Sequence, residues 1–270
     1  MELTKNAELI LEKRYLKKDK KGKVSETFSK MLRRVARTIA EIDKKYDSSA
    51  KISAVEKDFY SAMSNGDFLP NSPTLMNAGT ELEQLSACFV LPIEDSLKSI
   101  FETLKISALI YQSGGGVGFN FGKLRSKNSI VRTTHGIASG PVSFMKMFDC
   151  ATNVIKYGGT RRGANMGILP VTHPDILEFI KAKNTVGVLC NFNLSVAVTD
   201  KFIDAVKKGL KFHLKDPTSG KIINSVNAED IFNEIVNSAW ESGDPGLIFI
   251  DRVNKDNPTP LVGEIEATNP

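Results

Sequence analysis

The sequence predicts an α/β protein in which a helical region precedes a series of strands and helices. Between residues 5 and 65, apolar residues recur at the three- and four-residue spacing of helices with one buried face. After residue 67, short apolar strands alternate with helices, which is the pattern of an α/β domain. We therefore expect a helical region over residues 1–66 and an α/β region over residues 67–270.

Local signals place individual elements of the helical region. Ser25 is a candidate N-cap for a helix that follows it, and Gly66 is well placed to end a later helix. One buried helix face is predicted from the spacing of Phe28, Met31, Leu32, Val35, Ala36 and Ile39, and a second helix from Val55, Phe59 and Met63.

Capping residues and alternation place the elements of the α/β region. Residues 188–198 alternate between apolar and polar positions, which predicts a strand with one polar face and with Cys190 as a small buried residue. Residues 247–250 are a candidate last buried strand. Helix starts are predicted at Asp95 or Ser96, at Pro141, at Thr172 with Pro174, and at Asn227 with Asp230.

Composition limits the class of protein. The chain has 270 residues, a net charge of +5 and three scattered cysteines, Cys88, Cys150 and Cys190. These are too few for a disulfide framework, and no cysteine and histidine spacing predicts a metal site. No apolar run approaches the roughly 18 residues of a membrane helix, and no signal sequence begins the chain. We expect a protein of the reducing cytoplasm that does not bind membranes.

A basic segment over residues 13–23 has two interpretations. Its lysines and arginine suit nucleic acid, but a solvated helix end with its turn is the favoured interpretation. Only Tyr15 adds an aromatic ring to this segment, and single-stranded nucleic acid is usually bound on several stacked rings. We therefore expect no nucleic acid as partner.

Two glycine-rich segments suit close approach to a ligand. Residues 114–118 follow a helix and precede a strand, which is the reverse of a dinucleotide-binding fingerprint, and they lack the Gly-Lys of a P-loop. Residues 158–167 combine four glycines with Arg161 and Arg162, which predicts a mobile loop with forked donors for phosphate or base edges. For residues 114–118 the structural alternative is a tight turn, and for residues 158–167 it is a solvated basic loop.

Several long motifs, in order, resemble ribonucleotide reductase large subunits, most closely the adenosylcobalamin-dependent class. The resemblance covers nearly the whole chain, from about Ala7 to Pro270. It implies the first half of a ten-stranded α/β barrel after the helical region. The motifs are Asn71-Ser72-Pro73-Thr74-Leu75-Met76-Asn77-Ala78-Gly79, Leu85-Ser86-Ala87-Cys88-Phe89-Val90-Leu91-Pro92, residues 114–119, residues 138–145, residues 158–167 and Glu266-Ala267-Thr268-Asn269-Pro270.

The resemblance implies roles for single residues in the reduction of ribonucleotides to 2′-deoxyribonucleotides. Cys88 is similar to the first member of the redox pair, and Asn269 to the asparagine that binds the reacting ribose. Contacts to the substrate are implied for Ser72, Ala87, Cys88 and Gly116. As partners, the resemblance implies a thioredoxin-like reductant and the C-terminal half of the reductase.

The resemblance also implies a specificity site for a deoxynucleoside triphosphate effector. Asp95, Ser96, Leu97, Arg125 and Arg132 are its expected residues. Residues 133–140 would form one effector loop, and residues 158–167, with Arg161 and Arg162, a second that reaches the substrate base. Helices beside this site form homodimers in the family, so we expect a homodimer of the complete protein.

The last residue precedes the position where the family carries Cys-Gly-Glu, with its radical cysteine and glutamate. We expect the chain to be inactive alone, and we interpret it as an extein segment beside an intein, a split-gene product or a truncation. An open half-barrel would leave an unpaired strand edge that favours aggregation. An oxygen-dependent large subunit and a non-catalytic nucleotide-binding module remain as alternative functions.

Overall fold

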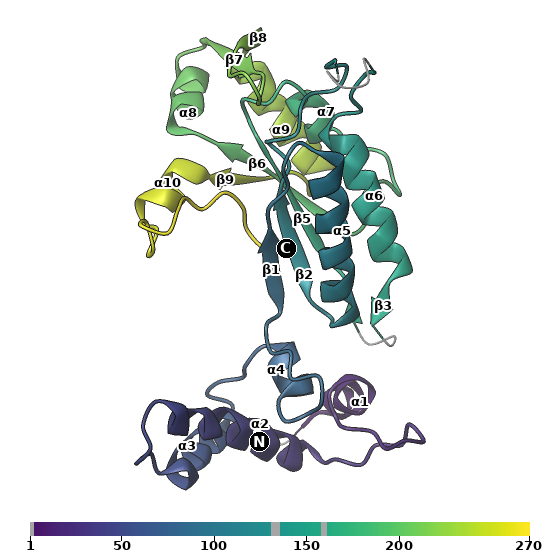
Figure 1. Ribbon diagram of the computed structural model, residues 1–270, viewed down its shortest axis with the longest axis vertical. Coiled ribbons are helices and arrows are strands. Elements are labelled where there is room, and N and C mark those ends of the chain that lie inside the picture. Colours follow the sequence, from purple (N-terminus) through teal and green to yellow (C-terminus); the bar gives the residue numbers. More distant parts are fainter. Residues whose placement is uncertain (1–2, 131–135, 158–160) are drawn as a thin grey trace. The chain divides into compact units, whose positions relative to one another are not determined.

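The computed structural model describes residues 3–130, 136–157 and 161–270, and residues 156, 157, 161 and 162 are described by their backbone alone. The chain divides into two compact units, Met1–Ala87 and Cys88–Pro270. Figure 1 shows helices in the first unit and a sheet with helices in the second. The first unit extends beyond the expected boundary at residue 66, because the segment around Leu75 and Ala78 packs into its core.

The first unit is helical, as the apolar spacing predicts. Its elements are α1 (Lys5–Arg14), α2 (Phe28–Ala40), the 3₁₀ helix η1 (Glu41–Lys45), α3 (Ile52–Asn65) and α4 (Ser72–Asn77). Gly66 ends α3 in the left-handed conformation, with a φ of 85°. Ser25 is not the N-cap of α2, because Thr27 takes that position and accepts a hydrogen bond from the Lys30 amide.

A largely buried ion pair ties the short helix α4 to α2. The Nε atom of Arg34 lies 2.8 Å from Oε1 of Glu26, and the two side chains are 11% and 8% exposed. The same guanidinium donates to the carbonyl oxygens of Leu75 and Ala78 at the end of α4. Arg34 therefore satisfies carbonyls that the helix itself leaves free.

The second unit is built on a parallel five-stranded sheet in the order β1-β2-β5-β6-β9. Within the described residues the sheet stays open, with β1 and β9 at its edges. Its strands are β1 (Cys88–Leu91), β2 (Gly116–Asn120), β5 (Asn165–Pro170), β6 (Phe192–Val198) and β9 (Gly246–Phe249). A helical region followed by parallel strands confirms the expected fold class, with five strands that correspond to a half-barrel.

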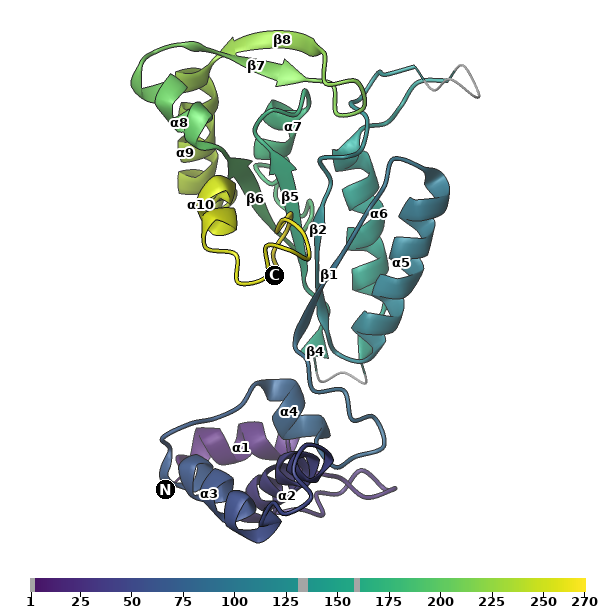
Figure 2. The same cartoon turned by 60° about the vertical axis from the view of Figure 1, so that its left-hand side comes forward.

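Helices connect the strands, and two short antiparallel ribbons complete the unit. In Figures 1 and 2, α5 (Leu97–Gln112) and α6 (Pro141–Val154) lie side by side on one face of the sheet. The other helices are α7 (Ile176–Ile180), α8 (Asp200–Lys207), α9 (Ala228–Ser242) and α10 (Ile250–Lys255). The ribbons are β3 (Lys156–Tyr157) with β4 (Arg161–Arg162), and β7 (Lys211–Lys215) with β8 (Ile222–Asn227).

Aromatic rings fill the space between the sheet and its helices. Phe119 packs 4.9 Å from Phe148, centroid to centroid, and Phe121 and Phe192 complete the cluster. All four side chains are at most 1% exposed. None of the helices in the described part of the chain is long and apolar enough to cross a membrane.

A buried polar chain crosses this apolar core. The hydroxyl of Tyr111 donates to Oδ1 of Asn165 at 2.6 Å, and Nδ2 of Asn165 donates to the Thr152 hydroxyl at 2.8 Å. Burial raises the pKa of Tyr111 to about 12. The network connects α5, α6 and the first residue of β5, so it fixes β5 against both helices.

Several expected elements differ from the structure. β6 begins at Phe192 rather than residue 188, and Cys190 is exposed because it lies in the preceding turn. The predicted loop 158–167 contains β4 and the start of β5, a central strand. The last strand, Gly246–Phe249, is an edge strand that is only half-buried, and α7 begins at Ile176, after Asp175 rather than at Thr172 or Pro174. Asn227 caps α9 through the Glu229 amide.

The ion pair of the first unit generates a prediction about acid stability. Burial alone would raise the pKa of Glu26, but the hydrogen bonds from Arg34 and from the Lys17 amide, with the charges of both residues, hold this pKa below 4.5. A carboxylate with a lowered folded pKa stabilises the fold above the unfolded value and loses this contribution as the pH falls below it. We expect Glu26→Gln to lower the free energy of unfolding by about 1–3 kcal/mol at pH 7.

The difference between wild type and Glu26→Gln should shrink as the pH falls below 4.5, which urea denaturation at several pH values measures. Glu41→Gln is the matched control, because its pair with Arg37 is exposed, with side chains 53% and 68% accessible. That control should change stability far less, because an exposed ion pair is screened by water and contributes little. Equal effects of the two substitutions at pH 7 would contradict the role given to Glu26.

Candidate functional site

Cys88 and Gly116 lie opposite each other at the starts of two paired strands. They are Cα partners in the parallel register of β1 and β2. A methyl group on Gly116 would lie 3.5 Å from Sγ of Cys88 and 2.7 Å from the ring of Pro270. The absence of a side chain at Gly116 therefore leaves room for a second group beside the thiol.

The last residues of the chain occupy this room. A methyl group on Gly118 would lie only 1.8 Å from the carbonyl oxygen of Thr268, so the tail runs directly over the glycines of β2. Sγ of Cys88 lies 4.0 Å from the carbonyl oxygen of Pro270. Asn269 is exposed within the same tail, and its amide donates to that carbonyl at 3.0 Å. The structure thus brings together Cys88, Gly116 and the segment that contains Asn269.

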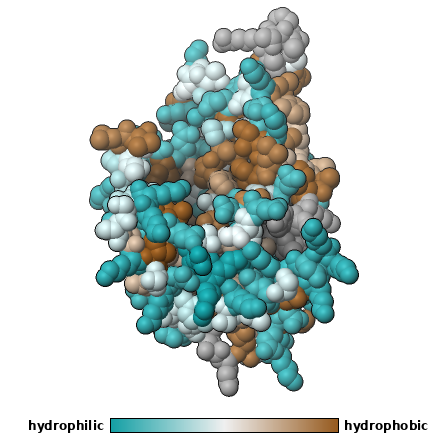
Figure 3. Space-filling model, turned by 60° about the horizontal axis from the view of Figure 1, so that its bottom comes forward, coloured by the Kyte–Doolittle hydropathy of each residue, from teal (hydrophilic) through white to brown (hydrophobic). Residues whose placement is uncertain are grey.

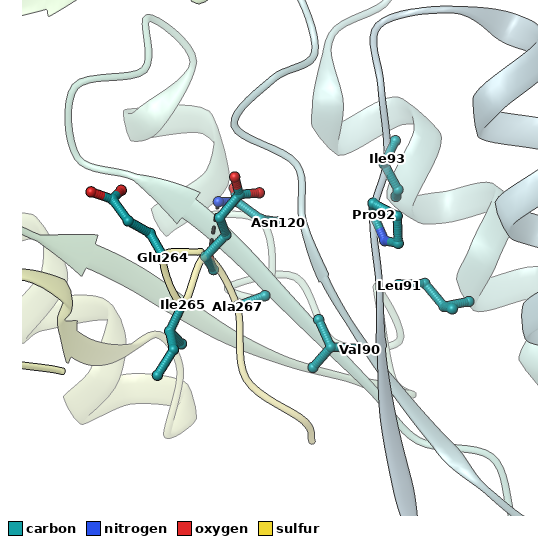
Figure 4. A pocket seen from close by; sticks show the side chains of 9 residues that line it. Val90, Leu91, Pro92, Ile93, Asn120, Glu264, Ile265 and Ala267 are labelled. Atoms are coloured by element: carbon teal, nitrogen blue, oxygen red, sulfur yellow. Dashed lines mark hydrogen bonds between the residues drawn. The ribbon is translucent and has the colours of Figure 1, made fainter. Parts of the chain in front are cut away.

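Two asparagine side chains anchor the residues before this tail. Nδ2 of Asn120, at the end of β2, donates to the Glu266 carbonyl at 3.0 Å, the bond drawn dashed in Figure 4. Asn254 in α10 bonds both backbone groups of Ile265, at 2.7 and 3.0 Å. Sequence patterns contained no signal for these contacts, because Asn120 and Glu266 lie 146 positions apart.

The anchored segment divides a crevice at the carboxyl ends of the strands into two pockets. One pocket, of about 340 Å³, is shown in Figure 4. The second, of about 260 Å³, lies beside Asn254 and Lys123. Lys123 pairs with Glu94 at 2.9 Å and with Glu266 at 3.4 Å. The first pocket is lined by Val90, Leu91, Pro92, Ile93, Asn120, Glu264, Ile265, Glu266 and Ala267.

Ser72 and Ala87 belong to the first unit. Ser72 is the first residue of α4, and its hydroxyl lies 2.9 Å from the hydroxyl of Tyr15. Ala87 is the last residue of that unit and is half-buried. Tyr15 is a contact that sequence reasoning did not assign to Ser72.

The second group of expected site residues gathers after β1 and β2. Nε of Arg125 donates to Oδ2 of Asp95 at 2.8 Å, and the Arg125 amide donates to Oδ1 at 3.2 Å. Both side chains remain partly accessible, at 30% and 24%. Ser96 is the N-cap of α5 and accepts from the Ser99 amide, while Leu97 is 64% exposed. The structure brings Asp95 and Arg125 together, and their contacts with a ligand stay a prediction.

The remaining expected effector residues are described in part or not at all. Arg132 lies outside the described residues. Arg161 and Arg162 form β4, which pairs with β3, and their side chains are not described. Of the first expected loop, residues 136–140 are described, and Ala138 donates its amide to the Ser129 carbonyl at 2.9 Å. In the described part of the chain, no group of histidine, cysteine and acidic side chains is arranged to hold a metal ion.

Fold and geometry define an α/β protein with a thiol at one end of a parallel strand pair and an arginine–aspartate pair at the other. Comparison with known families makes the assignment specific. Residues 86–270 match the ribonucleotide reductase barrel domain, and residues 1–83 match the ribonucleotide reductase all-alpha domain. The chain belongs to the ribonucleotide reductase large subunit family.

Curated relatives agree with this family. The chain is 46% identical to a vitamin B12-dependent ribonucleoside-diphosphate reductase of Thermoplasma acidophilum, matching over 100% of the chain and 42% of the relative. The protein of the same name from Mycobacterium tuberculosis H37Rv is 45% identical over 100% of the chain and 38% of its own length. A ribonucleoside-diphosphate reductase large subunit of Arabidopsis thaliana is 31% identical, over 96% of the chain and 34% of the relative. The chain therefore spans about two fifths or less of these relatives.

The packing of the tail over β2 generates a prediction. In Gly118→Ala the new methyl group would collide with the Thr268 backbone, so we expect the tail to leave the strand and the Asn120–Glu266 hydrogen bond to break. The side-chain amide signals of Asn120 in an NMR spectrum should then shift toward those of a solvated amide. Asn193→Ala, at an exposed position of β6, serves as control and should leave these signals in place. Unchanged Asn120 signals in folded Gly118→Ala would contradict the described packing.

Proposed function

We propose that this chain provides the redox cysteine and the effector-binding residues of a vitamin B12-dependent ribonucleotide reductase. The observation that carries the proposal is the placement of Cys88 opposite Gly116, with the Asn269 segment beside them. The names of the most similar relatives support the reaction and the cofactor. Identities of 45–46% to the B12-dependent proteins, against 31% to the Arabidopsis large subunit, favour the B12-dependent class.

The thiol of Cys88 would act as a reductant of the substrate. In the overall reaction, two thiols are oxidised to one disulfide, the ribose 2′-hydroxyl leaves as water, and a C2′–H bond forms. Cys88 would supply one thiol, and the second would come from the remaining part of the reductase. A thioredoxin-like protein would then reduce the disulfide by thiol–disulfide exchange.

The chain's own residues would hold the ribonucleotide rather than start the reaction. Gly116 lets the sugar approach the β2 backbone, and Asn269 offers an amide to its hydroxyl groups. Because Gly116 has no side chain, the space beside the Cys88 thiol is not filled by β2 itself, and the Pro270 ring lies there in the structure.

Adenosylcobalamin would supply the radical that starts the reaction when it is bound. The side chains that line the two pockets beside the tail include acids and amides but no histidine or cysteine that could face a cobalt ion. We derive no step through the cofactor from the residues of these two pockets.

The Asp95–Arg125 pair would form part of a site for a deoxynucleoside triphosphate. Arg125 offers a forked cation suited to phosphate, Asp95 offers acceptors for a ribose hydroxyl, and both stand near the N-terminus of the 16-residue helix α5. Arg132, Arg161 and Arg162 are further candidate contacts of this effector. A non-catalytic nucleotide-binding module would need only this second site.

Nucleotide titration of the 270-residue chain tests the effector site. Each of the four deoxynucleoside triphosphates is titrated calorimetrically, and we expect at least one to bind. Arg125→Ala should weaken that binding about 10- to 100-fold, because one charge-assisted contact is lost. Arg252→Ala is the matched control, since Arg252 also bonds an aspartate through Nε, at 3.1 Å from Asp200. No binding by folded wild type, or equal losses in both variants, would overturn this part of the proposal.

Exposed apolar residues on α5 support a homodimer. Leu97, Phe101 and Leu109 are 64%, 54% and 60% exposed, and their spacing places them on one side of the helix. Figure 3, coloured by hydropathy, shows brown hydrophobic side chains exposed among teal hydrophilic ones. Pairing of two α5 helices would remove such residues from water.

Sedimentation of the chain tests the homodimer. We expect Phe101→Glu to shift the protein toward the monomer, because a charge would be buried without a partner in the interface. Val236→Glu is the control, since Val236 is 48% exposed on α9 and should leave the association unchanged. A wild-type chain that sediments as a monomer at all concentrations, or a dimer insensitive to Phe101→Glu, would exclude α5 as its interface.

A further inference from the structure

His173 is a buried histidine with two defined hydrogen bonds. It lies in the turn between β5 and α7 and is 2% exposed. Its Nδ1 accepts a hydrogen bond from the Asp175 amide at 3.0 Å, and its Nε2 lies 2.9 Å from the Leu124 carbonyl oxygen. Because an amide can only donate to Nδ1, the ring carries its proton on Nε2 and donates it to Leu124.

The surroundings favour this neutral form of the ring. Burial lowers the pKa of His173 below its ordinary value, and this outweighs the Leu124 carbonyl and the charges of Asp175 and Asp216, which raise it. A protonated ring would present a second donor to the Asp175 amide. The observed pair of hydrogen bonds therefore requires neutral His173.

The carbonyl that His173 holds belongs to the residue before Arg125. Leu124 is 1% exposed, so its carbonyl finds its partner within the protein. On the other side, the Asp95 carboxylate holds both the amide and the side chain of Arg125. The backbone at residues 124–125 is thus fixed from both directions, by His173 and by Asp95.

The same turn also holds the segment that follows Arg125. Oδ2 of Asp175 accepts the Lys127 amide at 2.8 Å, and Glu178 pairs with the Lys127 ammonium at 3.0 Å. A methyl group on Gly140 would lie 2.9 Å from that Asp175 oxygen, so the backbone at Gly140 abuts the same carboxylate. The turn from His173 to Asp175 is therefore the support of the backbone around the Asp95–Arg125 pair.

We propose that His173 is a positioning residue of the nucleotide site at Asp95 and Arg125, which it serves by holding the Leu124 carbonyl. The inference rests on the proposed effector site and adds to it a residue that does not contact the nucleotide. With the Leu124 backbone fixed, the Arg125 guanidinium meets a triphosphate in one orientation. Without this tether, Arg125 would have to be ordered when the nucleotide binds, which weakens affinity.

A purely local role is the alternative, and two substitutions separate it from the proposed one. An asparagine at position 173 can accept from the amide two residues later, as Nδ1 does, but is too short to reach Leu124. A glutamine can extend an amide donor to the Leu124 carbonyl and lacks the short-range acceptor. His173→Asn thus keeps the turn and removes the tether, and His173→Gln does the reverse.

The experiment titrates the four deoxynucleoside triphosphates separately into the 270-residue chain, as wild type, His173→Asn and His173→Gln, with thermal unfolding of each. We expect His173→Asn to weaken the binding of the selected nucleotide about threefold to tenfold, the effect of one neutral hydrogen bond, and His173→Gln to stay within about twofold of wild type. Two results would overturn the inference. In one, His173→Asn binds the nucleotide as tightly as wild type. In the other, the loss of affinity in the two variants parallels their loss of thermal stability, whether or not the hydrogen bond to Leu124 is kept.

If the proposed effector site is wrong, wild type itself will bind no nucleotide. That result differs from those above, and it would also overturn the inference about His173. A second measurement uses wild type alone, so the inference can be tested even if a variant does not fold. The ¹⁵N signals of the His173 ring are recorded during the titration. We expect the Nε2–H signal to shift on nucleotide binding, since it bonds the residue next to Arg125. A signal that stays fixed while nucleotide binds would contradict the coupling.

Discussion

The parallel pairing of β1 with β2 is the constraint on which both candidate sites depend. Its register places Cys88 opposite Gly116 at one end. At the other end, the chain leaves β1 toward Asp95 and leaves β2 toward Arg125, which bond each other. Because the strands contain four and five residues, their first and last Cα atoms lie roughly 10–13 Å apart at about 3.3 Å per residue. A shift in this pairing would displace the thiol and the arginine–aspartate pair together.

Glycines in β2 leave space at the amino ends of the paired strands β1 and β2. Parallel α/β proteins commonly bind ligands at the carboxyl ends of their strands, where this unit has two pockets crossed by residues 264–266. The thiol of Cys88 stands at the opposite end, where Gly116 and Gly118 admit the chain's own tail. A sheet filled with larger side chains at these positions would exclude the tail from Cys88.

Local signals predicted those parts of the molecule that local interactions determine. Gly66, Ser96 and Pro141 were placed at helix ends because caps and fixed φ angles act within a few residues. The exposure of Cys190 was missed because Leu189 takes a positive φ of 51° and the interior position in that turn. The candidate site could be assembled from the sequence only through family motifs. Contacts such as that of His173 with Leu124 join distant segments and leave no local pattern.

The Cys88 thiol lies beside Gly116 and the tail that ends at Pro270. Nuclear Overhauser contacts in the 270-residue chain, with Cys88, Gly116 and Pro270 selectively labelled, test it most directly. The structure predicts cross-peaks from the Cys88 β-protons to the α-protons of Gly116 and to the ring protons of Pro270. Cross-peaks from Cys88 to core rings such as Phe119, with none to Gly116 or Pro270, would contradict it.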